Sequence, residues 1–304
     1  MGTPEFAVPC LKALIDNGHD VCGVLTQPDK PQGRGHKLTP PPIKVLAEEN
    51  NIEVFQPETL KNSEFREPLE SLAPEMIVVV AYGKILPEYI LNFPKHGCIN
   101  IHASLLPKYR GAGPIQWSVV NCEKKTGITS MLMEKGLDTG DMLLKAETDI
   151  GEYETAGELH DRLMLMGAEI LLETVKKAEN GELNPIPQND EESTYAPMIS
   201  KETARIDWSR SAKEVMGLVL GMNPWPIAHT LYKGESLKIY KAQISGKGKG
   251  KRGQIVNVSV DGIEVVCGDG FKILATEVQF AGSKRMPVRD YLNGHTVEVG
   301  EILG

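Results

Sequence analysis

Asn100 and His102 lie two residues apart in an apolar, extended run, 98–102. Alternate side chains of a β-strand share a face, so these two leave the same face about 6–7 Å apart. The run enters a loop rich in Gly and Pro, 104–113, and parallel α/β sheets bind ligands at the carboxyl ends of their strands. Asn and His also cap ordinary turns, so an active-site strand is predicted only if a partner group lies nearby.

A loop further along the chain offers His102 such a partner. Residues 136–141 read GLDTGD and lie between two strand-like runs. The glycines let the backbone turn sharply, and the loop carries the carboxylates of Asp138 and Asp141. An imidazole beside a carboxylate is a general base with an orienting partner. The sequence therefore predicts proton-transfer chemistry at the end of this strand.

Length and composition are those of a two-domain globular protein. The chain has 304 residues, 41% hydrophobic and 24% charged, which is enough for two hydrophobic cores. No apolar run approaches the roughly 20 residues that span a bilayer, and no signal peptide is recognised, so we expect no membrane partner. The five cysteines are scattered without a CxxC pair. This usage indicates reduced thiols, a cytoplasmic location and no metal site.

The distribution of charge is more informative than the net charge of −8. Residues 201–304 hold 15 Lys and Arg against 11 Asp and Glu, whereas the remainder holds 18 against 30. A basic C-terminal third on an acidic body suits a polyanion partner, although a solvated basic face gives the same excess.

Residues 1–184 alternate between strand-like and helix-like segments, which predicts a doubly wound parallel sheet. The sequence Thr155 to Glu158 is a capping box that opens a long amphipathic helix ending near 180–181. Residues 27–42 contain five prolines and four basic residues, a composition too punctuated for regular structure, so an extended functional loop is expected. The absence of a Gly-x-Gly-x-x-Gly fingerprint argues against hydride transfer.

The second part of the chain has a different pattern. Residues 185–203 are polar and proline-bearing, as in an interdomain linker. Residues 204–304 open with one helix and continue as short alternating strands separated by Lys-Gly and Asp-Gly turns, the pattern of a small β-barrel. The glycine- and lysine-rich stretch 246–252 is expected to be a flexible basic hairpin loop. A monomer is the default state.

Four further blocks accompany the candidate site. They are GTPEFA (2–7), TQPDKPQGRGHKLTPPPIKVLA (26–47), AYGKILP (81–87) and NPWPIA (223–228). Together with Asn100, His102, SLLPKYRG (104–111) and GLDTGD, they resemble the folate-dependent formyltransferases over nearly the whole chain. The first two blocks and the last distinguish members that act on tRNA from relatives that act on small amines.

The resemblance implies a Rossmann-like first domain, an OB-like barrel after it, and 10-formyltetrahydrofolate as formyl donor without a metal. The implied acceptor is the amino group of methionine on initiator methionyl-tRNA. Asn100 would donate to the developing oxyanion, His102 would take the ammonium proton or assist the oxyanion, and Asp138 would orient His102. No Ser or Cys nucleophile is needed, because the amine itself attacks.

The resemblance also implies two sets of binding residues. Those against the folate are Tyr82, Gly83, Ile85, Ser104, Leu105, Leu106, Pro107 and Leu137. Those for tRNA are Arg34 and Lys37 in the first long loop and Lys247, Lys249, Lys251 and Arg252 in the C-terminal domain. The family has a short apolar strand before Gly2, so this chain lacks that strand or its stated start is late.

Two alternatives remain open. A formyltransferase for a small amine would use the same Asn100, His102 and Asp138 but would need neither the 26–47 block nor a basic barrel. A non-catalytic RNA-binding protein with a decayed α/β domain would not need the intact set of Asn, His and Asp.

Overall fold

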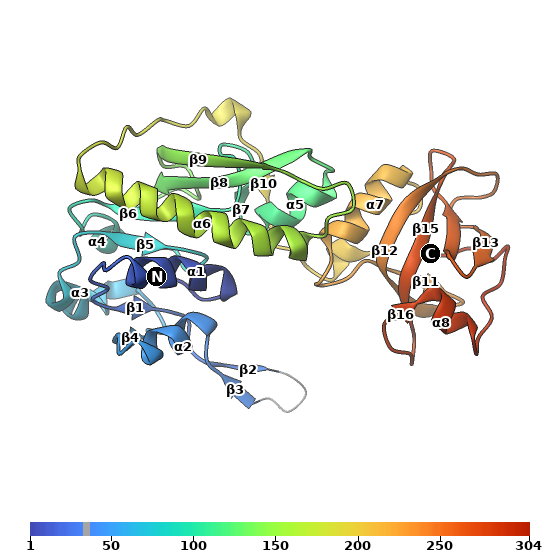
Figure 1. Cartoon of the computed structure of the whole chain (residues 1–304), viewed down its shortest axis with the longest axis horizontal. Coiled ribbons are helices and arrows are strands. Elements are labelled where there is room, and N and C mark those ends of the chain that lie inside the picture. Colours follow the sequence, from blue (N-terminus) through green and yellow to red (C-terminus); the bar gives the residue numbers. More distant parts are fainter. Residues whose placement is uncertain (33–36) are drawn as a thin grey trace. The chain divides into compact units, whose positions relative to one another are not determined.

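The computed structural model describes residues 1–32 and 37–304. Contacts divide the chain into two units (Figure 1). The N-terminal unit comprises 1–111, 126–148 and 160–195, and the C-terminal unit comprises 112–125, 149–159 and 196–304.

A mixed sheet forms the centre of the N-terminal unit. Its strand order is β5-β6-β8-β9, with β5 at Ile77–Val79, β6 at Cys98–His102, β8 at Lys125–Leu132 and β9 at Met142–Asp149. The strands β5 and β6 are parallel, as are β1 (Val24–Leu25) and β4 (Val54–Phe55). The predicted parallel, Rossmann-like arrangement is therefore confirmed for these pairs. It is wrong for β8, which runs antiparallel to β6, because an alternating pattern does not fix the direction of a strand after a long connection.

Helices flank these strands. They are α1 (Val8–Asp16), α2 (Pro42–Glu49), α3 (Arg66–Leu72), α4 (Glu88–Leu91) and α6 (Ala156–Glu179). The capping box is confirmed, since Glu158 N donates to Thr155 Oγ1 over 3.2 Å and Thr155 N donates to Glu158 Oε2 over 2.9 Å. In Figure 1, α6 lies along the sheet, and the hydroxyl of its Thr174 donates to that of Ser130 on β8. The strand β6 is buried along its whole length.

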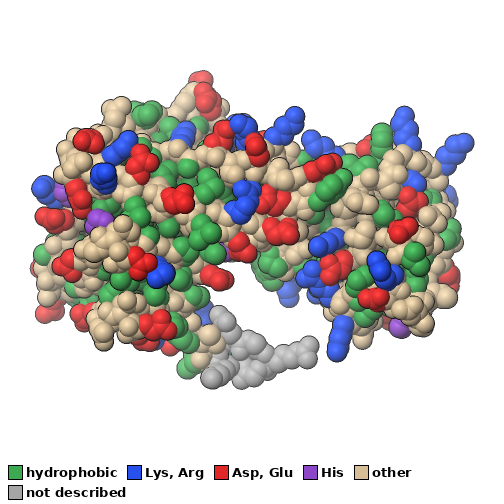
Figure 2. All heavy atoms as spheres, in the orientation of Figure 1, with side chains coloured by type: hydrophobic (Ala, Val, Ile, Leu, Met, Phe, Trp, Pro, Cys, Tyr) green, Lys and Arg blue, Asp and Glu red, His purple; other side chains and the backbone are tan. Residues whose placement is uncertain are grey.

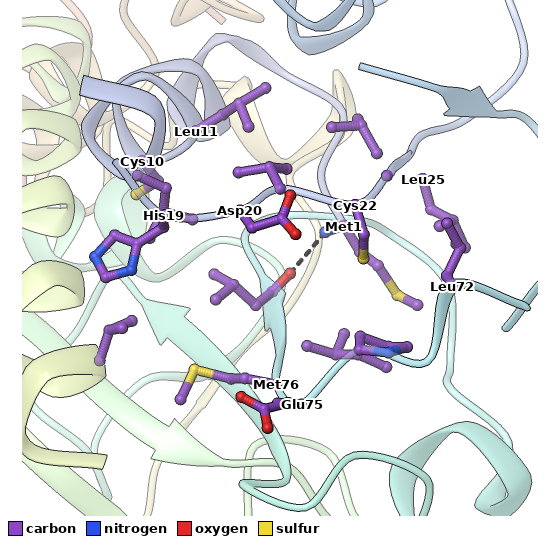
Figure 3. Close-up of a pocket in the computed structure, with 18 of the residues that line it drawn as sticks. Met1, Cys10, Leu11, His19, Asp20, Cys22, Leu25, Leu72, Glu75 and Met76 are labelled. Carbon is purple, nitrogen blue, oxygen red and sulfur yellow. Dashed lines mark hydrogen bonds between the residues drawn. The ribbon is translucent and has the colours of Figure 1, made fainter. Parts of the chain in front are cut away.

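Met1 and Gly2 join β1 to the segment containing β5. Gly2 N donates to Leu25 O over 3.0 Å, and Val80 N donates to Met1 O over 2.9 Å. The Met1 amine donates to Val78 O over 2.6 Å, the dashed line in Figure 3. Gly2 and Val80 form an isolated parallel bridge.

A cavity of about 460 Å³ lies beside this bridge. Apolar side chains of both strands line it, among them Val24, Leu25, Ile77 and Val78. Burial lowers the pKa of the Met1 amine from its ordinary 8.0 to about 6, because the charged form loses its hydration.

The long loop expected at 27–42 is partly regular. The strands β2 (Lys30–Gln32) and β3 (Lys37–Thr39) pair antiparallel, with Pro31 opposite Leu38. The expectation of a wholly irregular segment is wrong, because a two-stranded ribbon consists only of edge strands and tolerates a residue without an N–H.

An open antiparallel sheet is the core of the C-terminal unit. Its order is β11-β12-β15-β14-β13, with β16 also on β15. The strands are β11 (His229–Tyr232), β12 (Glu235–Lys247), β13 (Ile255–Ser259), β14 (Gly262–Val266), β15 (Phe271–Phe280) and β16 (Met286–Pro287). No closed barrel forms among the described strands. The unit's helices are α5 (Pro114–Val120), α7 (Ala212–Gly221) and α8 (Val288–Leu292), and a capping box between Ser211 and Glu214 opens α7.

The basic stretch 246–252 is not a hairpin loop. It joins β12 to β13, and these strands are not neighbours, because β12 pairs with β11 and β15 while β13 pairs with β14. Glycine and lysine content predicts a flexible connection but carries no information on which strands it connects.

The described residues also lack membrane-spanning helices, metal-binding clusters and disulfides. No helix in 1–32 or 37–304 is long and apolar enough to cross a membrane. The same residues contain no cluster of His, Cys, Asp and Glu suited to a metal ion. All five cysteines are free, and burial raises the pKa of Cys10, Cys98 and Cys267 to about 12, so these thiols stay protonated at neutral pH.

Candidate active site

His102 ends β6 and is only 6% exposed. Its Nε2 lies 2.9 Å from the carbonyl oxygen of Tyr109. A carbonyl only accepts hydrogen bonds, so Nε2 carries the hydrogen, and the neutral ring presents a lone pair at Nδ1. The backbone of Tyr109 therefore selects the tautomer in which Nδ1 can accept a proton.

Asp138 faces that nitrogen. Its Oδ2 lies 3.7 Å from His102 Nδ1, which is too long for a hydrogen bond but close enough for a charge interaction once the ring is protonated. The same oxygen accepts a hydrogen bond of 2.8 Å from Gly111 N. Asp138 has a φ of 53°, a left-handed conformation that Asp adopts more readily than most residues. The turn therefore aims its carboxylate back at β6.

Asn100 reaches the same carboxylate, since its Nδ2 donates to Asp138 Oδ1 over 3.4 Å. Asn100 and His102 thus share a face of β6 as predicted, and the structure brings all three candidate residues together. Asp141 differs, because its backbone carbonyl accepts from Leu132 N over 2.9 Å and so holds the end of the loop to β8. The arrangement can accept a proton at Nδ1, stabilise the resulting imidazolium, and present an amide donor beside it.

The residues predicted against the folate differ in exposure. Ile85 is 87% exposed and Leu137 57% exposed, whereas Tyr82, Ser104 and Leu106 are buried. Gly83 is exposed, and Leu105 and Pro107 are half-buried.

The hydroxyl of Thr129, directly opposite His102 on β8, holds the 104–106 turn. It donates to Ser104 O over 2.7 Å and accepts from Leu106 N over 3.2 Å. The side chain of Leu106 packs in a buried cluster with Met131 and Met142. The backbones of Ser104 and Leu106 are thus held by β8, and the side chain of Leu106 packs against Met131 of the same strand.

The residues predicted to bind tRNA lie in two places. Arg34 falls outside the described residues, as does the side chain of Lys37 on β3. Lys249, Lys251 and Arg252 are exposed on the connection that follows β12, and exposed Lys247 lies 5.7 Å from the ring centroid of Phe271. Figure 2 shows Lys and Arg at several places on the drawn face of the C-terminal unit with acidic side chains among them. The exposed charge is mixed rather than a single basic patch.

Sequence reasoning missed three groups that build the site. Two are the Tyr109 carbonyl and the Gly111 amide, which lie within the SLLPKYRG block but act through the backbone. The third is Gln188, whose Nε2 donates to the carbonyls of Asp138 and Gly140, each over 2.8 Å. Nothing in the sequence links Gln188 to a loop some fifty residues earlier.

Comparison with protein families gives two matches. The family described as "Formyl transferase" matches residues 1–175, and "Formyl transferase, C-terminal domain" matches residues 198–296.

Individual proteins resemble the chain over its full length. A "Methionyl-tRNA formyltransferase" from Alkaliphilus oremlandii is 56% identical over 305 residues, covering 100% of this chain and 98% of the relative. A protein of the same name from Caldanaerobacter subterraneus subsp. tengcongensis is 53% identical over 306 residues with the same coverage. Among solved structures, an N-formyltransferase from Helicobacter canadensis in complex with folinic acid and dTDP-3-aminofucose superposes with a TM-score of 0.65 at 20% identity. It covers 90% of this chain and 96% of its own. At that identity the likeness shows the fold.

Proposed function

Because this chain belongs to the formyl transferase family, we propose that it transfers a formyl group from 10-formyltetrahydrofolate to the amino group of methionine on initiator methionyl-tRNA, for translation initiation. The observation that carries the proposal is the identity of 50% or more with methionyl-tRNA formyltransferases over the whole chain, both units included. The cluster of Asn100, His102 and Asp138 supplies the chemistry.

In this reaction the methionyl amine attacks the formyl carbon, the carbonyl oxygen becomes negatively charged, and the attacking nitrogen must lose a proton. His102 accepts that proton at Nδ1, the nitrogen left free by the Tyr109 carbonyl. Asp138 stabilises the imidazolium that results. Collapse of the tetrahedral intermediate then breaks the bond between the formyl carbon and N10 of the folate, and the folate nitrogen leaves with the proton returned by His102. General base catalysis of this kind contributes roughly 100- to 10,000-fold.

Asn100 donates its amide to the developing oxyanion. Its present hydrogen bond to Asp138 is long, at 3.4 Å, so little free energy is lost when the amide turns to form a shorter hydrogen bond to the oxyanion. Loss of an oxyanion donor typically slows a reaction by about 100- to 1,000-fold.

Exposed apolar groups on the loops of the N-terminal unit fit a flat folate. Ile85 and Leu137 leave large apolar surfaces in water in the protein alone, and such surfaces gain free energy when a ring system covers them. Leu105 and the backbones of Tyr82, Gly83 and Pro107 complete the proposed wall.

The C-terminal unit is proposed as the tRNA-binding domain, with its sheet serving as an OB-like surface. Lys247, Lys249, Lys251 and Arg252 would contact phosphates, and Arg34 and Lys37 of the first long loop would grip the acceptor end. We propose a cytoplasmic monomer organised as domain 1–184, linker 185–203 and domain 204–304.

The decisive test is a formyl-transfer assay with 10-formyltetrahydrofolate and two acceptors, methionyl initiator tRNA and a small amine such as an amino sugar nucleotide. We expect turnover only with the charged tRNA. Turnover confined to the small amine would assign the chain to that branch of the family, and tRNA binding without turnover would make it a non-catalytic RNA-binding protein.

The roles of the two basic regions are separable. We expect Arg34→Ala to impair formylation severely while folate affinity is unchanged, because the folate wall is built from other loops. Replacing the four basic residues of 247–252 by Ala should weaken tRNA binding modestly and flatten its dependence on salt. The affinities of both variants for tRNA and folate, measured across a salt series, test these two expectations. If Arg34→Ala weakens folate binding as much as tRNA binding, the loop instead covers the folate site.

A further inference from the structure

We propose that Gln188 is a positioning residue for proton transfer, which fixes the Asp138 loop against the strand that orients His102. The proposal rests on the proposed function, since it assigns His102 and Asp138 to the proton-transfer step. Gln188 lies in the segment that the sequence predicts to be a linker, yet its side chain is directed into the site.

The carboxamide of Gln188 uses both of its donors and its acceptor within the site. Its Nε2 donates to Asp138 O and to Gly140 O, each over 2.8 Å. Its Oε1 accepts from Arg110 Nε over 3.0 Å. One side chain therefore joins the backbone of the Asp138 loop to the strand β7 (Arg110–Gly111).

Arg110 is itself fixed. Its side chain is largely buried, and its Nη2 donates to Asp190 Oδ1 over 2.7 Å. The backbone around it is held by Thr194, whose carbonyl accepts from Arg110 N over 2.9 Å and whose hydroxyl accepts from Tyr109 N over 2.8 Å. Asp190 and Thr194 thus fix the position of Arg110, the residue through which Gln188 is joined to β7.

The two segments that Gln188 joins are those that supply the polar contacts to the His102 ring, because Tyr109 directly precedes β7. Tyr109 O binds Nε2 and sets the tautomer, while Asp138 Oδ2 lies 3.7 Å from Nδ1. Gly111 N also donates to Asp138 Oδ2. A shift of the loop would change the Nδ1 to Oδ2 distance directly, and a misplacement of about 1 Å at a reacting group can cost about 100-fold in rate.

The substitution that isolates this role is Gln188→Glu. It keeps the shape of the side chain and an acceptor for Arg110, but it replaces the donors to Asp138 O and Gly140 O by an oxygen that those carbonyls repel. The matched control is Asn180→Asp, because it makes the same change from amide to carboxylate at an exposed residue directly after the end of α6.

We expect Gln188→Glu to lower kcat by about 10- to 100-fold while the KM values for tRNA and folate stay within about twofold, a split typical of lost transition-state stabilisation. The midpoint of the acid limb in the pH profile of kcat should change. The midpoint of the NMR titration curve of the His102 ring, which is measured without substrate, should change in the same direction. Asn180→Asp should match the wild type in all three measurements.

A folded Gln188→Glu protein with wild-type kcat and an unmoved His102 titration would overturn the proposal, as would a loss of kcat without any change in the titration. If the wild type itself does not formylate methionyl-tRNA, the proposed function fails instead, and the NMR titration still decides whether Gln188 positions His102.

Discussion

Two regions of the N-terminal unit contrast in how their backbone is held. Around His102, the turn at 104–106, the strand β7 and the Asp138 loop are each fixed by hydrogen bonds from another segment. Around Met1, β1 and the segment of β5 are joined beside a cavity of about 460 Å³ by three hydrogen bonds of the first two residues.

This contrast shows that the candidate active site is not at the cavity. The cavity here is lined by none of the candidate catalytic residues, whereas the chemistry lies where polar groups from several segments converge on one imidazole. Changes at His102 should therefore affect turnover with little effect on folding. Changes at a buried residue that lines the cavity, such as Val24, should affect stability with little effect on turnover.

The strongest test of this separation uses Asn100→Ala and His102→Ala. Each should lose at least about 100-fold in turnover, because an oxyanion donor or a general base is removed. Both should keep a thermal midpoint close to that of the wild type in calorimetry. Near-normal turnover in a well-folded Asn100→Ala protein would remove it from the catalytic set.

The sequence predicts this site better than it predicts the supports of the site. The two-residue spacing of Asn100 and His102 fixed their common face, and GLDTGD identified a carboxylate that the structure places beside them. The capping box at Thr155 is also predictable from the sequence, because its two residues lie only three positions apart. Gln188 was not, because a hydrogen bond to a distant backbone carbonyl requires no particular neighbours in the sequence.

The direction of β8 and the neighbours of β12 could not be predicted for a related reason. Hydrophobic periodicity reports which face of a strand is buried, but not which strand lies beside it. The open sheet of the C-terminal unit follows from those pairings, whereas its turns at 233–234 and 269–270 were visible as Lys-Gly and Asp-Gly.

A second test compares the two carboxylates of one loop. Asp138→Asn should lower kcat about 10- to 100-fold with folate binding retained, because a neutral amide stabilises a charged His102 poorly. Asp141→Asn should have a smaller effect, since Asp141 holds the loop through its backbone carbonyl. Single-turnover rates and folate titrations of both variants decide the matter, and a larger loss in Asp141→Asn would show that the wrong carboxylate was assigned.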